Sequence, residues 1–375
     1  MIRVLSIFGT RPEAVKMAPV IQALNNCPEI ESRVCVTGQH RQMLDQVLDL
    51  FDIQPDIDLN LMRPNQTLAN LTADILTYLN PVLQSEQPDW VLVQGDTTTV
   101  MAASLLCYYS RILIGHVEAG LRTHDKWQPF PEEINRRVAS VCADLHFAPT
   151  EHSRQNLLSE GVPDQTILVT GNPVIDALNE IVRRPAPLEM QELLERLEIT
   201  SGKKKLILVT AHRRENFGEP LKNICLALRS LAQAYPDQLQ LVYPVHLNPN
   251  VTETVYPMLG DVPNITLLKP LEYLPLVHLL KHATLVLTDS GGLQEEATSL
   301  GKPTLVLRNV TERPEGVEAG VLKLVGTDPG LILQSARRLL DDPAAYQAMA
   351  NVKNPFGDGH ASERIVQAIL QYPPK

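Results

Sequence analysis

Short, wholly apolar runs alternate with longer amphipathic stretches along almost the whole chain, and this alternation limits the possible folds more than any other feature. The apolar runs lack a period of two, which is typical of strands covered on both faces. The amphipathic stretches between them, such as 67–86, 220–235 and 291–300, predict helices. Alternating β and α units predict an α/β fold with parallel sheets. The predicted strands are 3–8, 33–37, 90–94, 112–117, 145–148, 166–170, 205–210, 240–245, 265–268, 285–288, 304–307 and 321–325.

The length of the chain and one polar segment predict two domains. A chain of 375 residues is more typical of two domains than of one. Residues 172–202 hold helical stretches with Pro185 and Pro187, and they lead into a run of charged residues that is typical of a solvated linker. The predicted parts are 1–171, 172–360 and a last segment, 361–375. Each half then has about six strands, enough for one doubly wound sheet.

Composition excludes several classes of protein. Hydrophobic residues make up 44% and charged residues 20%, so we expect a full core rather than disorder. A formal net charge of -10 argues against nucleic acid or an anionic membrane as the main partner. The cysteines are odd in number and form no CxxC pair, so reduced thiols in a cytoplasmic protein are expected. Neither a leader segment nor a membrane span is predicted.

Ligands of open parallel sheets bind beyond the carboxyl ends of the strands, so the polar residues at those ends are the candidates. The first strand leads into Gly9-Thr10-Arg11-Pro12-Glu13, followed by Lys16. A helix that starts there would favour an anion at its N-terminus, close to Arg11 and Lys16. Two surface cations explain the same residues about equally well. The chain has no GxGxxG motif, so a dinucleotide cofactor is not supported.

A second segment with paired glycines predicts a phosphate site. In Asp289-Ser290-Gly291-Gly292, Ser290 would cap a helix and the glycines would let a phosphate approach the backbone. Glu296, just inside that helix, is placed to bind ribose hydroxyls. A capped helix with acidic residues is the simpler alternative. The segment also repeats the pattern of 91–98, which predicts two sites of the same kind in two Rossmann-like halves.

Three acidic residues of the first half are candidates for proton transfer. Asp96 and Glu118 each follow a predicted strand, and they would approach each other if those strands were neighbours. Two close carboxylates titrate as a coupled pair, which can hold one acid and one base near neutral pH. Glu132, in Pro131-Glu132-Glu133, is a third candidate, although that sequence is also an ordinary helix start.

His212 is the fourth candidate, because it ends a strand beside Arg213 and Arg214. It could bind phosphate or transfer a proton. A metal site is less favoured, since no HExxH, DxD or dense His/Asp cluster accompanies it.

Taken in order, these segments resemble the non-hydrolysing UDP-N-acetylglucosamine 2-epimerases of bacteria along essentially the whole chain. The matching segments are Phe8-Gly9-Thr10-Arg11-Pro12-Glu13-Ala14, Gln39-His40-Arg41, Gly95-Asp96-Thr97-Thr98-Thr99, His116-Val117-Glu118-Ala119-Gly120-Leu121-Arg122-Thr123, Pro131-Glu132-Glu133, His212-Arg213-Arg214-Glu215, Pro244-Val245-His246-Leu247-Asn248-Pro249 and Asp289-Ser290-Gly291-Gly292-Leu293-Gln294-Glu295-Glu296.

The resemblance implies two Rossmann-like, doubly wound parallel-sheet domains that face each other across a cleft, as in the glycosyltransferase-B type. It implies a homodimer without metal or other cofactor, and a last helix over 361–372 that packs on the first domain. Acid–base roles would fall on Asp96, Glu118 and Glu132, with His212 assisting. Contacts to UDP would fall on Arg11, Lys16, His212, Ser290, Gly291, Gly292, Glu296 and Arg313.

The implied reaction converts UDP-N-acetylglucosamine to UDP-N-acetylmannosamine through anti elimination of UDP to 2-acetamidoglucal, for surface polysaccharide synthesis.

Two departures from the pattern of the family affect binding. Leu271 and Leu276 stand where relatives often have Gln and Phe at the uracil. Asn65 replaces a basic residue of a possible activator site, of which Gln39, Gln42 and His246 remain.

Three other functions stay open. A glycosyltransferase of the same fold would use a similar nucleotide site, but three acids in one half favour two-sided proton transfer. A hydrolysing epimerase would release UDP and free sugar; the lack of a fused kinase-like domain argues against it. A sugar-nucleotide-binding regulator would not need the acids.

Overall fold

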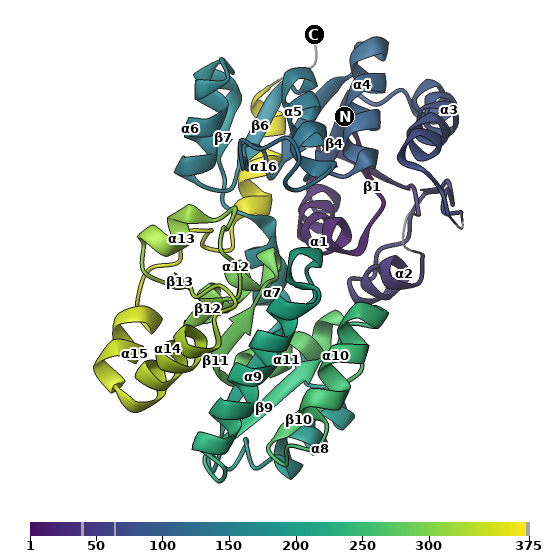
Figure 1. Cartoon of the computed structure of the whole chain (residues 1–375). Helices are drawn as coiled ribbons and strands as arrows, with labels where there is room; N and C mark the ends of the chain where they lie inside the picture. The colour runs from purple at the N-terminus through teal and green to yellow at the C-terminus, as the bar shows by residue number, and fades with distance from the viewer. Residues whose placement is uncertain (39–40, 64, 373–375) are drawn as a thin grey trace. The chain divides into compact units, whose positions relative to one another are not determined.

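The chain forms two compact units, each with its own parallel sheet (Figure 1). The computed structural model describes residues 1–38, 41–63 and 65–372. Unit 1 comprises Met1–Asn179 and Phe356–Lys375, and unit 2 comprises Glu180–Pro355. The chain therefore passes from unit 1 to unit 2 after Asn179 and returns to unit 1 after Pro355. The sequence analysis predicted these domain boundaries after residues 171 and 360.

Unit 1 contains a seven-stranded parallel sheet in the order β3-β2-β1-β4-β5-β6-β7. Its strands are β1 (Ile2–Phe8), β2 (Ile30–Val36), β3 (Ile57–Asp58), β4 (Trp90–Gln94), β5 (Leu113–Val117), β6 (Leu145–Ala148) and β7 (Ile167–Val169). Its helices are α1 (Arg11–Asn25), α2 (Arg41–Leu50), α3 (Leu68–Glu86), α4 (Thr98–Ser110), α5 (Glu132–Cys142), α6 (Glu151–Ser159), α7 (Pro173–Ile181), which runs into unit 2, and α16 (Ala361–Gln371).

Unit 2 contains a six-stranded parallel sheet in the order β10-β9-β8-β11-β12-β13. Its strands are β8 (Lys205–Thr210), β9 (Leu239–Pro244), β10 (Ile265–Leu268), β11 (Ala283–Thr288), β12 (Thr304–Val306) and β13 (Leu322–Leu324). Its helices are α8 (Leu188–Arg196), α9 (Glu219–Ala234), α10 (Pro249–Leu259), α11 (Tyr273–His282), α12 (Gly291–Ser299), α13 (Pro314–Glu318), α14 (Pro329–Asp341) and α15 (Pro343–Ala350).

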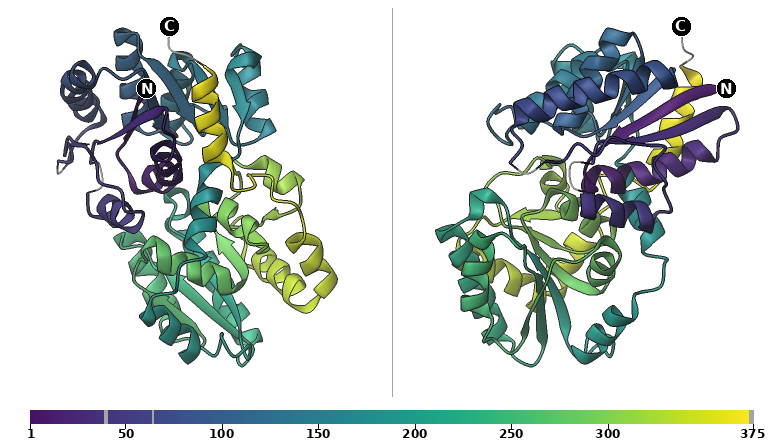
Figure 2. Two further views of the ribbon diagram at one scale, coloured as in Figure 1. Left: turned by 180° about the vertical axis from the view of Figure 1, so that it is seen from behind. Right: turned by 90° about the vertical axis from the view of Figure 1, so that its right-hand side faces the viewer.

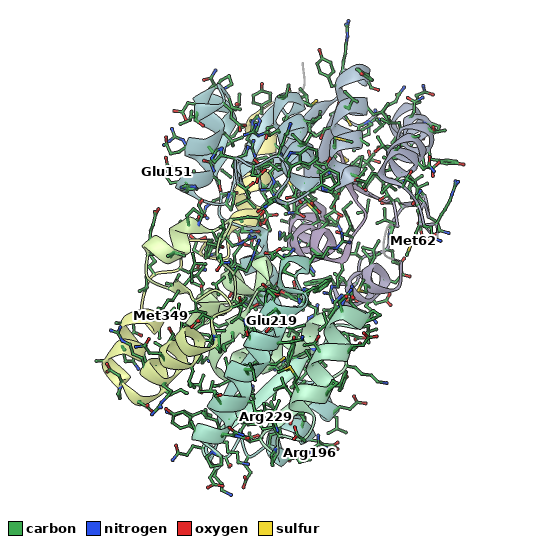
Figure 3. The ribbon with its side chains drawn as sticks, in the orientation of Figure 1. Met62, Glu151, Arg196, Glu219, Arg229 and Met349 are labelled. Atoms are coloured by element: carbon green, nitrogen blue, oxygen red, sulfur yellow. The ribbon has the colours of Figure 1, made fainter. Side chains whose placement is uncertain are left out.

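The central strands are buried on both faces, as their continuous apolar sequences predict. All five residues of β4 are buried, and α3 and α4 cover one side of the sheet of unit 1 with Ile75, Leu79 and Val100. In unit 2, α9 buries Leu228 and Leu231 and turns the opposite side to solvent. Figure 3 labels Glu219 at its start and Arg229 farther along; Arg229 is hydrogen-bonded to Asp261.

Both sheets reverse their strand order at one point. In unit 1 this switch point lies between β1 and β4, and in unit 2 it lies between β8 and β11. Ligands of doubly wound sheets bind at such points, beyond the carboxyl ends of the strands. The two similar segments of the sequence, 91–98 and 285–292, include most of β4 and of β11, which occupy equivalent positions in the two sheets. The repeated pattern therefore marks the same place in each fold.

The last helix, α16, belongs to unit 1. It contacts α1, and it lies among the elements of unit 1 in both views of Figure 2. Ile365 and Ile369 are fully buried, and the ring of Tyr372 packs edge-on against Trp90 at 5.6 Å. The amphipathic pattern of 361–372 thus faces the core of the first unit.

Candidate functional site

Glu118 stands directly after β5 and is 6% exposed. Lys16 Nζ lies 2.6 Å from each of its carboxylate oxygens, Gln94 Nε2 donates to Oε2 at 2.5 Å, and Asn172 Nδ2 donates to Oε1 at 2.8 Å. Its backbone has a φ of 64°, in the left-handed region that side chains of this size seldom adopt. Such a conformation persists only where the surroundings impose it, and it is common at functional sites.

Asp96 lies two residues beyond β4 and is half-buried. Arg136 of α5 donates to Asp96 Oδ2 from Nε at 3.1 Å and from Nη2 at 2.5 Å, and Asn135 Nδ2 donates to its carbonyl oxygen. The strands β4 and β5 are direct neighbours, with Gln94 opposite Val117, as the sequence analysis required. Each carboxylate has its own cation, Lys16 for Glu118 and Arg136 for Asp96, a feature that the sequence did not predict.

Glu132 is the first residue of α5, so its segment is indeed a helix start. Its neighbour Glu133 is buried and accepts hydrogen bonds from the backbone N–H groups of Thr123 and His124 and from Arg136. Because Arg136 contacts both Glu133 and Asp96, this first turn of α5 is tied to the end of β4.

A further carboxylate, Glu13, organises the switch point of unit 1. Its Oε2 accepts from the backbone N–H groups of Gly9 at 3.0 Å and Thr10 at 2.7 Å, and its Oε1 accepts from the hydroxyl of Thr97 at 2.7 Å. Burial raises the pKa of Glu13, although these hydrogen bonds stabilise its ionised form. Glu13 thereby joins the turn that precedes Arg11 to the turn that carries Asp96.

His212 lies beyond β8, at the switch point of unit 2. Asp289, beyond β11, is completely buried and accepts from the backbone N–H groups of His212 and Arg213, both at 2.7 Å. The ring of His212 stacks on that of His246 with centroids 5.3 Å apart. His212 therefore contacts the turn after β11 through Asp289 and the turn after β9 through His246.

The helix α12 starts beside these residues. Ser290 occupies its N-cap position, but the hydroxyl makes no capping hydrogen bond, which corrects the sequence-based expectation. Gly291 lies under Arg313, whose Nη1 would be 2.7 Å from a Cβ at this position, whereas a Cβ at Gly292 would meet no described atom within 4 Å. A side chain at 291 would therefore displace the guanidinium of Arg313, and Gly292 leaves its side of the helix N-terminus open. Helix N-termini of this kind favour anions.

The buried acidic residues of α12 hold two other side chains. Arg313 Nε donates to Glu295 Oε1 at 2.6 Å, and its Nη1 donates to Glu312. The hydroxyl of Tyr273 donates to Glu296 Oε1 at 2.7 Å. Burial and the negative charge of Glu296 raise the pKa of Tyr273 well above its usual value, so this phenol remains a donor.

The predicted residues of the possible activator site lie partly outside the described residues. Gln39 lies outside the described residues, as does the side chain of Gln42. His246 is exposed and stacks on His212, and Asn65 is exposed with a positive φ of 57°. Arg11, the remaining predicted residue, begins α1 and is half-buried.

Two other features are absent from the part of the chain that the structure describes. Residues 1–38, 41–63 and 65–372 contain no group of three His, Cys, Asp or Glu side chains arranged to hold a metal ion. Over the same residues, every helix is too short or too polar to cross a membrane.

Several residues of the site were missed from the sequence: Gln94, Arg136, Asn172, Tyr273 and Asp289. Arg136 and Asp289 lie inside segments that were recognised, where other side chains were chosen. Asn172 follows β7, so the rule of polar residues at strand ends could have found it. No local signal marks Tyr273, because its role depends on packing against α12.

Comparison with known proteins gives full-length matches. A family model described as UDP-N-acetylglucosamine 2-epimerase matches residues 22–370. A UDP-N-acetylglucosamine 2-epimerase of Escherichia coli K12 is 55% identical over 370 residues, which covers 98% of this chain and 98% of that protein. One from Salmonella typhimurium is 54% identical over 372 residues, covering 99% of each.

Solved structures show the same similarity. The crystal structure of UDP-GlcNAc 2-epimerase from Neisseria meningitidis, bound to UDP-GlcNAc, superimposes with a TM-score of 0.91 at 50% identity, covering 99% of this chain and 100% of that one. The enzyme from Methanocaldococcus jannaschii, in complex with UDP-GlcNAc and UDP, gives a TM-score of 0.84 at 33% identity, covering 99% and 100%. The two parallel sheets match the glycosyltransferase-B type of fold.

Proposed function

Because the chain belongs to the UDP-N-acetylglucosamine 2-epimerase family and is an isomerase of that class, we propose that it inverts carbon 2 of UDP-N-acetylglucosamine by eliminating and re-adding UDP. The product is UDP-N-acetylmannosamine, and the reaction needs neither a metal nor another cofactor. The observation that carries the mechanism is the pair of carboxylates, Asp96 and Glu118, at the ends of adjacent strands, each with its own cation.

Elimination solves a chemical difficulty. The hydrogen at C2 is not next to a carbonyl, so removing it directly would leave an unstabilised carbanion. In an anti elimination, a base takes the C2 proton, the C–H electron pair forms the C1=C2 bond, and UDP leaves C1 with the C–O electron pair. The intermediate is 2-acetamidoglucal. A proton then adds to C2 from the opposite face while a UDP oxygen forms the bond to C1.

The acid–base groups of this scheme belong to unit 1. Two opposite faces at C2 require at least two proton-transferring groups, and Asp96, Glu118 and Glu132 are of the correct type. Lys16 lies against the carboxylate of Glu118, and Arg136 lies against that of Asp96. We assign Glu118 as one proton-transferring group and Asp96 with Glu132 to the other face.

The nucleotide is bound chiefly by unit 2. The N-terminus of α12, with Ser290, Gly291 and Gly292, would receive the diphosphate, and Glu296 would accept hydrogen bonds from the ribose. Positive groups stabilise the charge that develops on departing UDP. For this role we propose Arg11, Lys16, His212 and Arg313; the contact of Lys16 with Glu118 would let it serve both the base and the leaving group.

Two parts of the proposed binding site depart from the pattern of the family. Leu271 and Leu276 pack against the apolar core of unit 2 as partly buried residues, so uracil would be recognised here through apolar contact and backbone groups. Activation by a second substrate molecule would use Gln39, Gln42 and His246, without the basic residue that Asn65 replaces.

We also propose a homodimer formed through unit 1. The adjoining helices α3, α4 and α5 carry large apolar side chains that are exposed in the single chain: Tyr78, Tyr108, Tyr109, Ile134 and Val141. Exposed apolar residues gathered on neighbouring helices are typical of protein interfaces. The enzyme would act in the cytoplasm and supply N-acetylmannosamine units for surface polysaccharide.

Proton NMR of UDP-N-acetylglucosamine incubated with the pure protein in D2O tests the reaction. We expect the anomeric signal of UDP-N-acetylmannosamine, deuterium at C2 of both epimers and no net release of UDP. Stoichiometric UDP with free sugar would instead indicate the hydrolysing reaction. An unchanged spectrum would favour a transferase that lacks its acceptor, and binding without turnover would favour a regulator.

A further inference from the structure

The carboxylate of Asp289 joins the two turns at the switch point of unit 2. Its Oδ2 accepts from the backbone N–H groups of His212 and Arg213 at 2.7 Å each and from Asn216 Nδ2 at 3.1 Å. The hydroxyl of Tyr243 donates to the carbonyl oxygen of Ala211 at 2.5 Å. The backbone around His212 is therefore held at several points, and Asp289 Oδ2 has as many donors as a carboxylate oxygen commonly takes.

The second oxygen of the same carboxylate has a different environment. Oδ1 is enclosed within unit 2 and makes no hydrogen bond with any atom of the described residues. It lies 3.5 Å from His212 Nδ1. A buried carboxylate oxygen without a donor costs free energy and calls for an explanation. The imidazole of His212, at this distance, is a group that can supply a proton to it.

We propose that Asp289 is a positioning residue that keeps a proton on His212 Nδ1 and thereby makes Nε2 the nitrogen that meets the diphosphate. In a neutral imidazole one ring nitrogen donates and the other accepts, and the partner of one nitrogen decides the state of the other. A carboxylate can only accept, so Nδ1 must donate. Asp289 also favours the imidazolium, in which Nε2–H can donate to the departing diphosphate oxygen.

The groups around the ring are compatible with a single positive charge. His246, which follows β9, stacks on His212 with an interplanar angle of 7°, and Arg213 adjoins it along the chain. A positive charge on the ring of His212 would face the stacked ring of His246 on one side and the carboxylate of Asp289 on the other. The proposal rests on the assignment of His212 to the diphosphate, but its structural part can be tested without turnover.

The experiment is long-range proton–nitrogen NMR of the full-length protein with 15N-labelled histidine, without ligand, over a range of pH. The signals of His212 are identified by their loss in His212→Gln. In the neutral form we expect Nδ1 to be protonated and Nε2 to be unprotonated. Nε2-protonated His212 in the unaltered protein would overturn the proposal, and this measurement needs no variant of Asp289 to fold.

The variant Asp289→Asn separates the two functions of the carboxylate, which are to accept from the backbone N–H groups and to accept from His212 Nδ1. Its amide oxygen can still accept from the backbone N–H groups, while its NH2 group would face His212 Nδ1 and force that nitrogen to accept. We expect the tautomer to change to Nε2-protonated and kcat to fall about 10²-fold. The matched control is Tyr243→Phe, which loosens the same turn without touching Asp289 and should leave the tautomer unchanged.

The outcomes distinguish this proposal from the proposed reaction. If His212 has the expected tautomer but the D2O experiment shows no epimerisation, Asp289 positions His212 and the proposed reaction is wrong. If epimerisation occurs and Asp289→Asn leaves the tautomer unchanged, the role of Asp289 is wrong and the reaction stands.

Discussion

Lys16 and Glu118, which are 102 positions apart in the chain, form a two-oxygen ion pair in which the ammonium nitrogen lies 2.6 Å from both carboxylate oxygens. Lys16 comes from α1 and Glu118 follows β5, and the side chains are only 13% and 5% exposed. The pair brings a carboxylate and its counterion to the carboxyl edge of one sheet. Because water is largely excluded there, the charge of each group depends on the other.

Replacing Lys16 with Met should therefore disable Glu118. We expect kcat to fall about 10²-fold or more, because the carboxylate would lose its counterion and its orientation. The measurement is the initial rate of epimerisation together with deuterium incorporation at C2. The double variant Lys16→Met/Glu118→Gln should be little slower than the slower single variant, since residues that act as a unit are not additive. Lys222→Met, at an exposed position, is the control and should retain full activity.

The three carboxylates can be tested one at a time with isosteric amides. Asp96→Asn, Glu118→Gln and Glu132→Gln should each lose most turnover while folding normally, because an amide cannot remove a proton from carbon. Circular dichroism and thermal unfolding check the fold, and Glu151→Gln on the exposed start of α6 is the control. Full activity in any one variant would remove that residue from the mechanism.

The hydrogen bond from Tyr273 to Glu296 predicts a graded effect on nucleotide binding. Glu296→Gln should raise the Kd for UDP about tenfold or more, equivalent to about 1.4 kcal/mol, because ribose loses a charged acceptor. Tyr273→Phe should have a smaller effect, since Glu296 keeps its charge. Isothermal titration calorimetry measures both, with Tyr256→Phe as an exposed control.

The ligand provides a second control for this prediction. With 2′-deoxy-UDP, one of the two ribose hydroxyls is missing, and the penalty of Glu296→Gln should shrink. An equal penalty for UDP and 2′-deoxy-UDP would mean that Glu296 does not bind the ribose 2′-hydroxyl.

His116 predicts a dependence of stability on pH. Its ring is completely buried, Nε2 is hydrogen-bonded to the carbonyl oxygen of Gly95 at 2.7 Å, and burial lowers its pKa from 6.5 to about 3. The unfolded chain therefore binds a proton near pH 6.5 that the folded chain does not. The contribution of His116 to the free energy of unfolding is fully present above pH 6.5. It falls by about 1.4 kcal/mol per pH unit as the pH decreases toward about 3.

Urea unfolding at pH 6.5 and pH 5 measures this contribution. The unaltered protein should lose about 1.6 kcal/mol more between these values than His116→Gln, which has no such group to protonate. His152→Gln, at an exposed position on α6, should behave as the unaltered protein does. Equal losses in all three proteins would show that His116 is not buried as a neutral ring.

The sequence by itself determined the elements and the polar residues at their ends. Continuous apolar runs identify buried strands, since hydrophobic burial acts on each run locally, and paired glycines or charged groups after a run mark where it ends. This reasoning named Asp96, Glu118, His212 and Ser290 as candidates before any strand was paired. It missed β3, because Ile57–Asp58 is too short to form a pattern and is a strand only through its pairing with β2.

Only the tertiary structure decided which of these ends lie together. The order β3-β2-β1-β4-β5-β6-β7 brings Lys16 and Asn172 to Glu118, and the pairing of β11 with β8 brings Asp289 to His212. Such contacts join residues that are distant in the chain, so no local pattern encodes them. They arise because parallel strands, once packed in a given order, place their carboxyl ends at one edge, where buried charges must find partners.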